Sequence, residues 1–435
     1  MPNATVLPSP DAVPERTLDR RDARTLALAA LGGALEFYDF VVFVFFAVPL
    51  SHLFFPQHTA PWLAQLQVFG IFAAGYLARP LGGIVMAHYG DKLGRKRMFT
   101  FSVFLMAVPT LGIGLLPVYA QIGMLAPLLL LLLRVVQGIA VGGEVPGAWV
   151  FVAEHVPPRR IGFACASLTS GLTVGILIGS LVAAAINREL TPAEVLDYGW
   201  RLPFLAGGVF GFLAVWLRRW LSETPVFESM HARKVLAGGL PLRQVFERHL
   251  PSVVMSMLVT WMLTAAIVVL ILMTPSLVQS VFKMEPVRAF LGNNVASFAL
   301  ALGCLFFGWW ADRIGYARVL LFGAIGLLVC GYALYLDLQA GAAHFIALYA
   351  LTGFAVGVVG VVPALMVRAF PPAVRFSGVS FSYNVAYALF GGLTPPLIGM
   401  LTHRLSAIAP AHYVAFTALI GIAVACWLPR RPRLS

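Results

Sequence analysis

The sequence predicts an all-α polytopic membrane protein with twelve transmembrane helices in two six-helix halves. Of its 435 residues, 60% are hydrophobic and 11% are charged, and the mean hydropathy is +0.87. Because soluble domains carry about 25% charged residues, this composition excludes a soluble protein. The apolar residues fall in twelve segments with short polar connections, and two motifs recur at nearly the same offset along the chain.

Each apolar segment is long enough to cross a hydrocarbon core about 30 Å thick as a helix rising about 1.5 Å per residue. Backbone groups in lipid must form their hydrogen bonds within the segment, so we expect helices. The longest segments should tilt or extend beyond the bilayer. The predicted spans are 25–52, 62–89, 98–116, 122–155, 161–187, 199–221, 250–282, 286–310, 318–337, 343–370, 374–402 and 410–429.

The orientation is predicted from the connections between these segments. Most of the 30 Lys and Arg residues lie on the side that carries the N-terminal tail, the turn at 90–97 and the C-terminal tail. Since positively charged connections face the cytoplasm, both termini are predicted to be cytoplasmic. The net charge of +12 is therefore a signal of topology, and no nucleic-acid partner is expected.

Two sequence echoes divide the chain. The motif GDKLGRKR (90–97) matches ADRIGYAR (311–318), and GIAVG (138–142) matches GFAVG (353–357). Duplicated halves of this kind place a substrate site between them, near the middle of the membrane. The predicted divisions are a cytoplasmic tail at 1–24, halves at 25–221 and 250–429, a central cytoplasmic loop at 222–249 and a tail at 430–435.

The turn GDKLGRKR joins the second and third segments. Gly90 and Gly94 permit a tight turn, and Asp91 can cap a helical turn or pair with a basic neighbour. One interpretation is a surface turn that only sets topology. The other is a conformational latch in which Asp91 meets helix ends and the arginines pair with an acid such as Glu154. The predicted gating residues are Gly90, Asp91, Gly94, Arg95, Arg97, Asp312 and Arg313.

Charged residues within the apolar segments are costly and are therefore functional candidates. Glu36 and Asp39 lie three residues apart, on one face of the first segment. Arg79 in the second segment lies at a similar depth. Arg79 can pair with these carboxylates, or it can bind a substrate carboxylate through two parallel hydrogen bonds. A purely structural ion pair is the alternative.

The fourth segment carries further polar residues. Arg134 and Gln137 stand in the motif RVVQG, and Glu144 follows seven residues after Gln137, on the same helical face. Burial and a nearby arginine act in opposite directions on the protonation of a carboxylate, and proton coupling requires such a balance. We expect Gln137 to contact the substrate. The sequence does not decide which residue carries the proton, so the proton-coupling candidates are Glu36, Asp39, Arg134 and Glu144.

In the second half, the polar residues within the membrane are uncharged. Tyr383, Asn384 and Tyr387 can donate hydrogen bonds to a substrate, or they can link helices to one another. The four cysteines lack the spacing of metal ligands. No nucleotide-binding loop, metal cluster or nucleophile motif is found, so neither a cofactor nor an enzymatic activity is expected.

Several motifs together resemble the metabolite:proton symporter family of the major facilitator superfamily. They are GGALEFYDFVVFVFFA in the first segment, RPLGG with GDKLGRKR, RVVQGIAVGGE, GWRLPFL and SETPVF. The resemblance covers almost the whole chain. It implies proton-driven uptake of small organic acids or zwitterions such as citrate, 2-oxoglutarate, shikimate, proline and betaine. We therefore expect a monomeric symporter in the bacterial inner membrane that imports a small organic anion with protons by alternating access.

Two departures from the family pattern bear on this expectation. Gly315, Tyr316 and Ala317 replace the basic run of the second-half loop, which puts its gating role in doubt. The coiled-coil tail of osmosensing members is absent from this sequence, which disfavours an osmoprotectant carrier. The alternatives are a zwitterion carrier of the proline/betaine type, an efflux pump for drugs or metabolites, and a sensor that does not transport.

Overall fold

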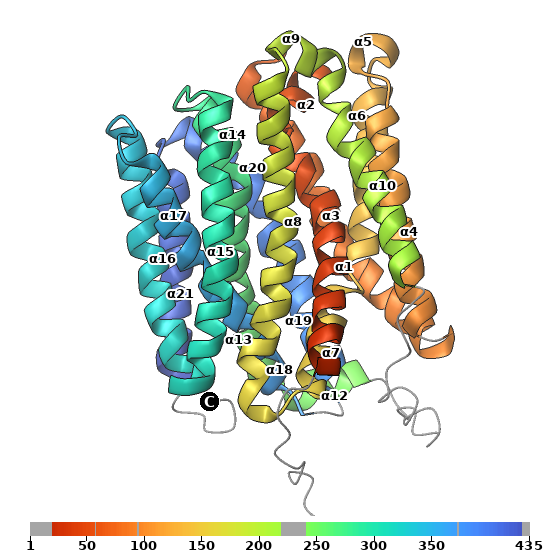
Figure 1. The fold of residues 1–435 in the computed structure, drawn as a ribbon, viewed down its shortest axis with the longest axis vertical. Coiled ribbons are helices and arrows are strands. Elements are labelled where there is room, and N and C mark those ends of the chain that lie inside the picture. Colours follow the sequence, from red (N-terminus) through yellow and green to blue (C-terminus); the bar gives the residue numbers. More distant parts are fainter. Residues whose placement is uncertain (1–19, 57, 94, 219–240, 372–373, 429–435) are drawn as a thin grey trace, which may run out of the picture.

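In the computed structural model, the chain forms a bundle of long helices that run roughly parallel or antiparallel to one another (Figure 1). The structure describes residues 20–56, 58–93, 95–218, 241–371 and 374–428, and no strand occurs among them. We call the end of the bundle at α12 the α12 end and the opposite end, at α9, the α9 end (Figure 1).

The N-terminal helices follow the order of the predicted segments. They are α1 (Arg20–Phe45), α2 (Ala47–Leu53), α3 (Pro61–Leu93), α4 (Arg95–Leu115), α5 (Tyr119–Ile122), α6 (Leu125–Val141), α7 (Val145–His155), η1 (Pro158–Arg160), α8 (Ile161–Glu189), α9 (Pro192–Glu194), η2 (Val195–Gly199) and α10 (Arg201–Arg218). Short kinks and breaks divide some of the spans. Prolines and paired glycines account for several of these breaks, because both residues disfavour the interior of a helix.

The C-terminal helices begin within the predicted central loop, where the last residues are helical. They are α12 (Pro241–Arg248), α13 (Leu250–Ala265), η3 (Ala266–Met273), α14 (Thr274–Ser280), α15 (Pro286–Ile314), α16 (Tyr316–Gln339), α17 (Phe345–Val356), η4 (Gly357–Val361), α18 (Val362–Ala369), α19 (Arg375–Ala386), η5 (Tyr387–Gly391), α20 (Gly392–Arg404) and α21 (Ala409–Trp427). Runs such as α13–η3–α14 form one span each, with a locally widened or tightened turn in the middle.

The helices agree with the predicted twelve-helix fold. Among the described residues, eight helices are long and apolar enough to cross a membrane, and two bent pairs raise this number to ten. The bent pairs are α1 with α2, and α9 and η2 with α10. α3 and α4 lie where the second and third spans were predicted. The all-α membrane architecture is therefore confirmed.

Two predicted elements differ in detail. The predicted span 122–155 is interrupted, because α6 ends at Val141 and α7 begins at Val145, although Leu125–Val150 still forms one stretch long and apolar enough to cross a membrane. Two successive glycines in this break and Pro146 in the first turn of α7 explain the interruption. The predicted turn at 90–97 is also much shorter than expected, because α3 continues to Leu93 and α4 starts at Arg95.

The GIAVG and GFAVG echoes have a shared structural cause. Gly138 and Gly142 pack so closely on α3 that a Cβ atom at either position would overlap the backbone of that helix. Gly353 and Gly357 pack on α15 in the same way. Helices can approach at such short distances only where small residues face one another. The α3–α6 pair therefore has its counterpart in the α15–α17 pair.

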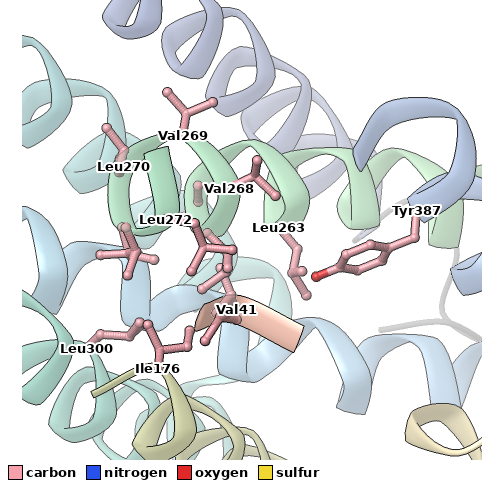
Figure 2. Close-up of a cluster of buried hydrophobic side chains, with 14 of the residues drawn as sticks. Val41, Ile176, Leu263, Val268, Val269, Leu270, Leu272, Leu300 and Tyr387 are labelled. Carbon is pink, nitrogen blue, oxygen red and sulfur yellow. The ribbon is translucent and has the colours of Figure 1, made fainter. Parts of the chain in front are cut away.

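The N-terminal and C-terminal helices meet along a long apolar interface. α8 packs along α15, α3 packs against α20, and α1 contacts η3. Figure 2 shows buried side chains at this junction, including Val41 of α1, Ile176 of α8, Leu300 of α15 and Leu272 of η3. Tyr387 lies at the edge of this cluster. The interface continues from this apolar core into a group of aromatic and charged residues around Arg79.

Candidate functional site

Arg79 lies in the middle of α3 and is completely buried. Its guanidinium carbon lies 4.4 Å from the ring centroid of Tyr387, 5.3 Å from that of Tyr76, 5.6 Å from that of Phe40 and 5.7 Å from that of Tyr383. These distances are those of cation–π contacts. We call the four rings, which come from α1, α3, α19 and η5, the aromatic cage.

The guanidinium of Arg79 makes no hydrogen bond of regular geometry within the part of the chain that the structure describes, and the hydroxyl of Tyr387 is the polar side-chain group beside it. Nε, Nη1 and Nη2 alike lack such a bond. A buried charge without hydrogen-bond partners is unfavourable, and aromatic faces compensate only part of that cost. A carboxylate that entered the cage would accept two parallel hydrogen bonds from the planar guanidinium, which is the geometry that arginine favours.

Arg134, unlike Arg79, donates hydrogen bonds of regular geometry to neighbouring groups. Its Nη1 donates to Oε1 of Gln137 at 2.8 Å, and its Nη2 donates to the backbone oxygen of Phe40 at 2.9 Å. The Nε2 of Gln137 in turn donates to Oγ1 of Thr110 at 2.7 Å. Arg134 and Gln137, which share the motif RVVQG, are thus hydrogen-bonded to each other. Gln137 nevertheless uses its amide within this network, so its predicted contact with substrate requires the network to open.

Phe40 connects the two arginines. Its ring centroid lies 4.0 Å from the guanidinium carbon of Arg134 and 5.6 Å from that of Arg79. Its backbone oxygen is also an acceptor for Arg134. A movement of α1 at this position therefore changes the surroundings of both cations.

Asp39 is buried, but it does not face Arg79. A Cβ atom placed on Gly207 would lie 2.6 Å from Oδ1 of Asp39, and one on Gly211 would lie 3.2 Å from Oδ2. The carboxylate therefore points at α10. The expected pairing of Arg79 with Asp39 is absent, because a common depth does not fix the direction in which a helix turns its side chains. Glu36 lies on α1, and its side chain is outside the described residues.

Glu144 lies at an interruption of the helix that the sequence predicted to be continuous. It lies in the break between α6 and α7, directly before α7, and is 8% exposed. Counting seven residues from Gln137 assumed an uninterrupted helix, and α6 ends at Val141. The expected alignment of Gln137 with Glu144 on one face therefore crosses an interruption of the helix, and both residues are buried.

Asn384 links two helices, which is one of the two roles that the sequence left open for it. Its Nδ2 donates to the backbone oxygen of Gly142 at 2.7 Å and so links α19 to the α6–α7 break. Its Oδ1 has no hydrogen-bond partner among the described residues. The rings of Tyr383 and Tyr387 contact each other at a tilt of 55°, with centroids 4.6 Å apart, and both belong to the aromatic cage.

Three residues around Arg79 were not singled out in the sequence. Tyr76 precedes Arg79 by one helical turn, so a search for aromatic residues at that spacing could have found it. Phe40 follows Asp39 directly. Trp149 of α7 meets the ring of Tyr383 edge to face, with centroids 4.8 Å apart, and its Nε1 has no partner in the described part of the chain. No sequence signal points to Trp149, because its position depends on how α7 packs against α19.

Asp312 joins the two sets of helices at the α12 end. Its Oδ1 accepts a hydrogen bond from the backbone N–H of Gly162, and its Oδ2 accepts one from that of Phe163, both at 2.8 Å. These are free N–H groups at the start of α8, where a carboxylate is favoured. The hydroxyl of Tyr316 donates to the same carboxylate at 2.9 Å. Tyr316 therefore takes part in this contact although it belongs to the departure from the family motif.

The other predicted gating residues are only partly described. Arg313 lies over the ring of Trp309 on its own helix, with its guanidinium carbon 4.0 Å from the centroid. Gly90 and Asp91 lie near the end of α3, and Arg95 and Arg97 lie in the first turn of α4. The side chains of these four residues, the residue Gly94, and the expected acidic partner Glu154 lie outside the described part of the structure.

The two sets of helices also contact each other at the α9 end. The hydroxyl of Ser276 donates to the backbone oxygen of Val44 at 3.2 Å, which joins α14 to α1. The rings of Trp62 and His403 stack with centroids 4.3 Å apart and so join α3 to α20. The two sets of helices are therefore in contact at both ends, and Arg79 is buried between them.

Comparison with known proteins decides the family. The profile of the Major Facilitator Superfamily matches residues 29–293. The chain belongs to this superfamily. A putative proline/betaine transporter of Staphylococcus aureus (strain COL) is 32% identical over 417 residues, covering 94% of this chain and 88% of the relative. The citrate-proton symporter of Klebsiella pneumoniae is 30% identical over 408 residues, covering 92% and 90%.

A further relative and a solved structure agree with this family. The shikimate transporter of Escherichia coli (strain K12) is 32% identical over 391 residues, covering 88% of each chain. The structure of a proton:xylose symporter superimposes with a TM-score of 0.77 at 17% identity, covering 94% of this chain and 95% of the other, which shows a common fold. The resemblance to metabolite:proton symporters is thus confirmed. The chain is a multi-pass membrane transporter rather than an enzyme.

Proposed function

We propose that this major facilitator protein takes up a small carboxylate-bearing solute together with protons by alternating access. The observation that carries the proposal is the buried guanidinium of Arg79, which lies between the two sets of helices with unused hydrogen-bond donors. The names of relatives that are citrate, shikimate and proline/betaine carriers support it, since each of these solutes contains a carboxylate. Tyr383, Tyr387 and Asn384 contribute the remaining contacts with the solute.

In this proposal Asp39 is the favoured proton carrier. It is buried against α10 and separate from Arg79, so its protonation does not compete directly with the binding of a carboxylate. Phe40 follows Asp39 in α1 and contacts both Arg79 and Arg134. A shift of α1 on protonation of Asp39 would therefore reach the solute site through Phe40. Glu36, Glu144 and Arg134 remain the other candidates.

A zwitterion carrier is the second candidate function. The putative proline/betaine transporters among the relatives favour it, and so do the aromatic rings beside Arg79, whose faces attract cationic groups. Such a solute would use Arg79 in the same way, since a zwitterion of this type also carries a carboxylate.

Uptake into proteoliposomes tests the proposed function. Radiolabelled carboxylates and betaines are offered with and without an inward proton gradient, and a protonophore serves as the control. We expect at least one carboxylate-bearing solute to accumulate only when the gradient is present. Equal uptake with and without the gradient, or no gradient-dependent uptake of any tested solute, would contradict proton-coupled import.

We also propose the topology and organisation that the sequence suggests. The α12 end would face the cytoplasm, with both termini there, in the inner membrane of a bacterium. The protein would work as a monomer of two six-helix halves, 25–221 and 250–429, with the connection 222–249 between them. A reporter enzyme that is active only in the cytoplasm, fused after residue 435, should then be active.

Replacing Asp312 with Ala should weaken the closed α12 end. The change removes two hydrogen bonds between a carboxylate and backbone N–H groups of α8, each worth about 1.5–3 kcal/mol. The population open at that end should rise at least about tenfold. Cys165 and Cys304 are buried within α8 and α15, so thiol labelling of these two residues in a Cys330→Ser, Cys426→Ser background reports the opening.

Asp337→Ala is the matched control for this prediction. Asp337 also accepts hydrogen bonds from a backbone N–H, that of His344, but both residues belong to the C-terminal helices. Labelling of Cys165 and Cys304 should not change in this variant. Equal labelling in the Asp312 variant and wild type would show that the contact does not hold the α12 end closed.

A further inference from the structure

We propose that the solute carries a single carboxylate, and that the aromatic cage together with Trp149 holds the remainder of the molecule, so that di- and tricarboxylates are excluded. The inference rests on the proposed function, because it narrows the class of solute that binds at Arg79. It also assigns Trp149, which no sequence motif marks, to the binding site.

Few charged side chains are buried in the described part of the chain. Among the side chains that the structure describes, the buried charged residues are Asp39, Glu144, Arg79 and Arg134. The terminal nitrogens of Arg134 already donate to Gln137 and to the backbone of Phe40. Arg79 is therefore the single buried cation in the described part of the chain whose guanidinium makes no hydrogen bond of regular geometry.

One free guanidinium matches one carboxylate. The first carboxylate of a dicarboxylate would pair with Arg79, and the second would be buried without a cation, which is strongly unfavourable. The surrounding rings make burial of a second carboxylate still less favourable. Tyr76, Tyr383 and Tyr387 offer their faces to Arg79, and an aromatic face carries negative charge density that repels an anion.

The same rings suit the remainder of a monocarboxylate. An apolar ring or an onium group packs favourably on aromatic faces. Two buried polar atoms close to Tyr383 also lack partners among the described residues: Nε1 of Trp149, a donor, and Oδ1 of Asn384, an acceptor. A hydroxylated monoacid or a zwitterion can supply groups for them. Both solutes share the decisive feature, one carboxylate on a body without further negative charge.

Uptake of different solutes into proteoliposomes, and the affinity with which each is taken up, test the inference. Wild-type protein is supplied with shikimate, proline, glycine betaine, 2-oxoglutarate and citrate at pH 7.5 under a fixed proton gradient. We expect one or more of the first three to be taken up. We expect 2-oxoglutarate and citrate to bind at least about tenfold more weakly, as the burial of one unpaired charge requires. Uptake of shikimate alone indicates a neutral body, and uptake of proline or betaine indicates a zwitterion.

The possible failures are distinguishable. Proton-driven uptake of citrate or 2-oxoglutarate with an affinity equal to that of the best monocarboxylate would overturn this inference and leave the proposed function intact. Absence of proton-driven uptake for every solute would contradict the proposed function and this inference with it.

A pair of tryptophan variants tests the assignment of Trp149. Trp149→Phe keeps an aromatic ring beside Tyr383 and removes the N–H group. It should raise the KM for uptake of the accepted solute by about tenfold, with an unchanged maximal rate per folded protein. Trp216→Phe alters an exposed residue of α10 and is the control, with unchanged kinetics. An unchanged KM in Trp149→Phe would remove Trp149 from the site, and a fall in maximal rate alone would indicate a structural role.

Discussion

Asp39→Asn should abolish proton-driven accumulation and leave exchange of internal for external solute intact. Asp39 is buried, and its Oδ1 has no hydrogen-bond partner among the described residues. Asn has the same shape and stays uncharged, so the variant should behave as a permanently protonated carrier. Exchange requires no net movement of protons and should persist. Accumulation and exchange of a labelled solute in the same proteoliposomes measure the two effects.

The variants Glu36→Gln and Glu144→Gln are the matched comparisons. If Asp39 carries the proton, both should still accumulate solute against a gradient. Normal accumulation in Asp39→Asn, with a loss in one of the other two, would move the coupling role to that residue. Because Asp39 does not pair with Arg79, its neutralisation leaves no cation newly unpaired, and the amount of folded protein in the membrane should be unchanged.

Arg79→Lys should weaken solute binding by about ten- to hundredfold. Lysine retains the positive charge but loses the planar pair of donors that matches a carboxylate. It also loses the flat contact with the rings of Tyr76 and Tyr387, which lie 5.3 and 4.4 Å from the guanidinium carbon. The half-saturation concentration for uptake, normalised to protein in the membrane, measures this effect.

Arg404→Lys, a change at an exposed residue at the end of α20, is the control and should transport normally. If Arg79→Lys binds the solute as well as wild type does, the site of carboxylate recognition lies elsewhere. If the variant disappears from the membrane, the structural-pair interpretation gains support. Arg79→Gln combined with Glu36→Gln, which removes both charges, should then restore expression.

Much of the architecture follows from the sequence alone, because it depends on simple physical limits. The length of each apolar segment, the requirement for internal hydrogen bonds in lipid and the two echoed motifs are sufficient to predict the helices. The break at 142–144 was missed because hydropathy does not register it. Successive glycines followed by Pro146 are the local signal that would have predicted it.

The site was only partly predictable. Arg79, Arg134 and Asp39 stand out because charge in an apolar segment is rare. The direction of Asp39 toward α10 depends on the rotation of α1 and on the absence of side chains at Gly207 and Gly211. The aromatic cage unites residues of four elements, and aromatic side chains are too common in this chain to single them out. Tertiary packing, which sequence spacing does not encode, brings them together.

The contact of Asp312 with α8 was likewise not predictable from the sequence motif. The change to Gly-Tyr-Ala in the second-half loop put its gating role in doubt. In the structure Tyr316 of that departure donates to Asp312, and Asp312 accepts from the start of α8. A loop can therefore lose the basic residues of its motif and still hold two sets of helices together, provided that the carboxylate reaches free N–H groups.

The central claim is that Arg79 recognises the carboxylate of the solute. Calorimetric binding of the best transported monocarboxylate and of its neutral carboxamide, to wild type and to Arg79→Gln, measures that contact most directly. We expect the carboxamide to bind wild type at least about tenfold more weakly than the acid, and both to bind Arg79→Gln with equal affinity. An equal loss on amidation in the two proteins would show that another group recognises the carboxylate.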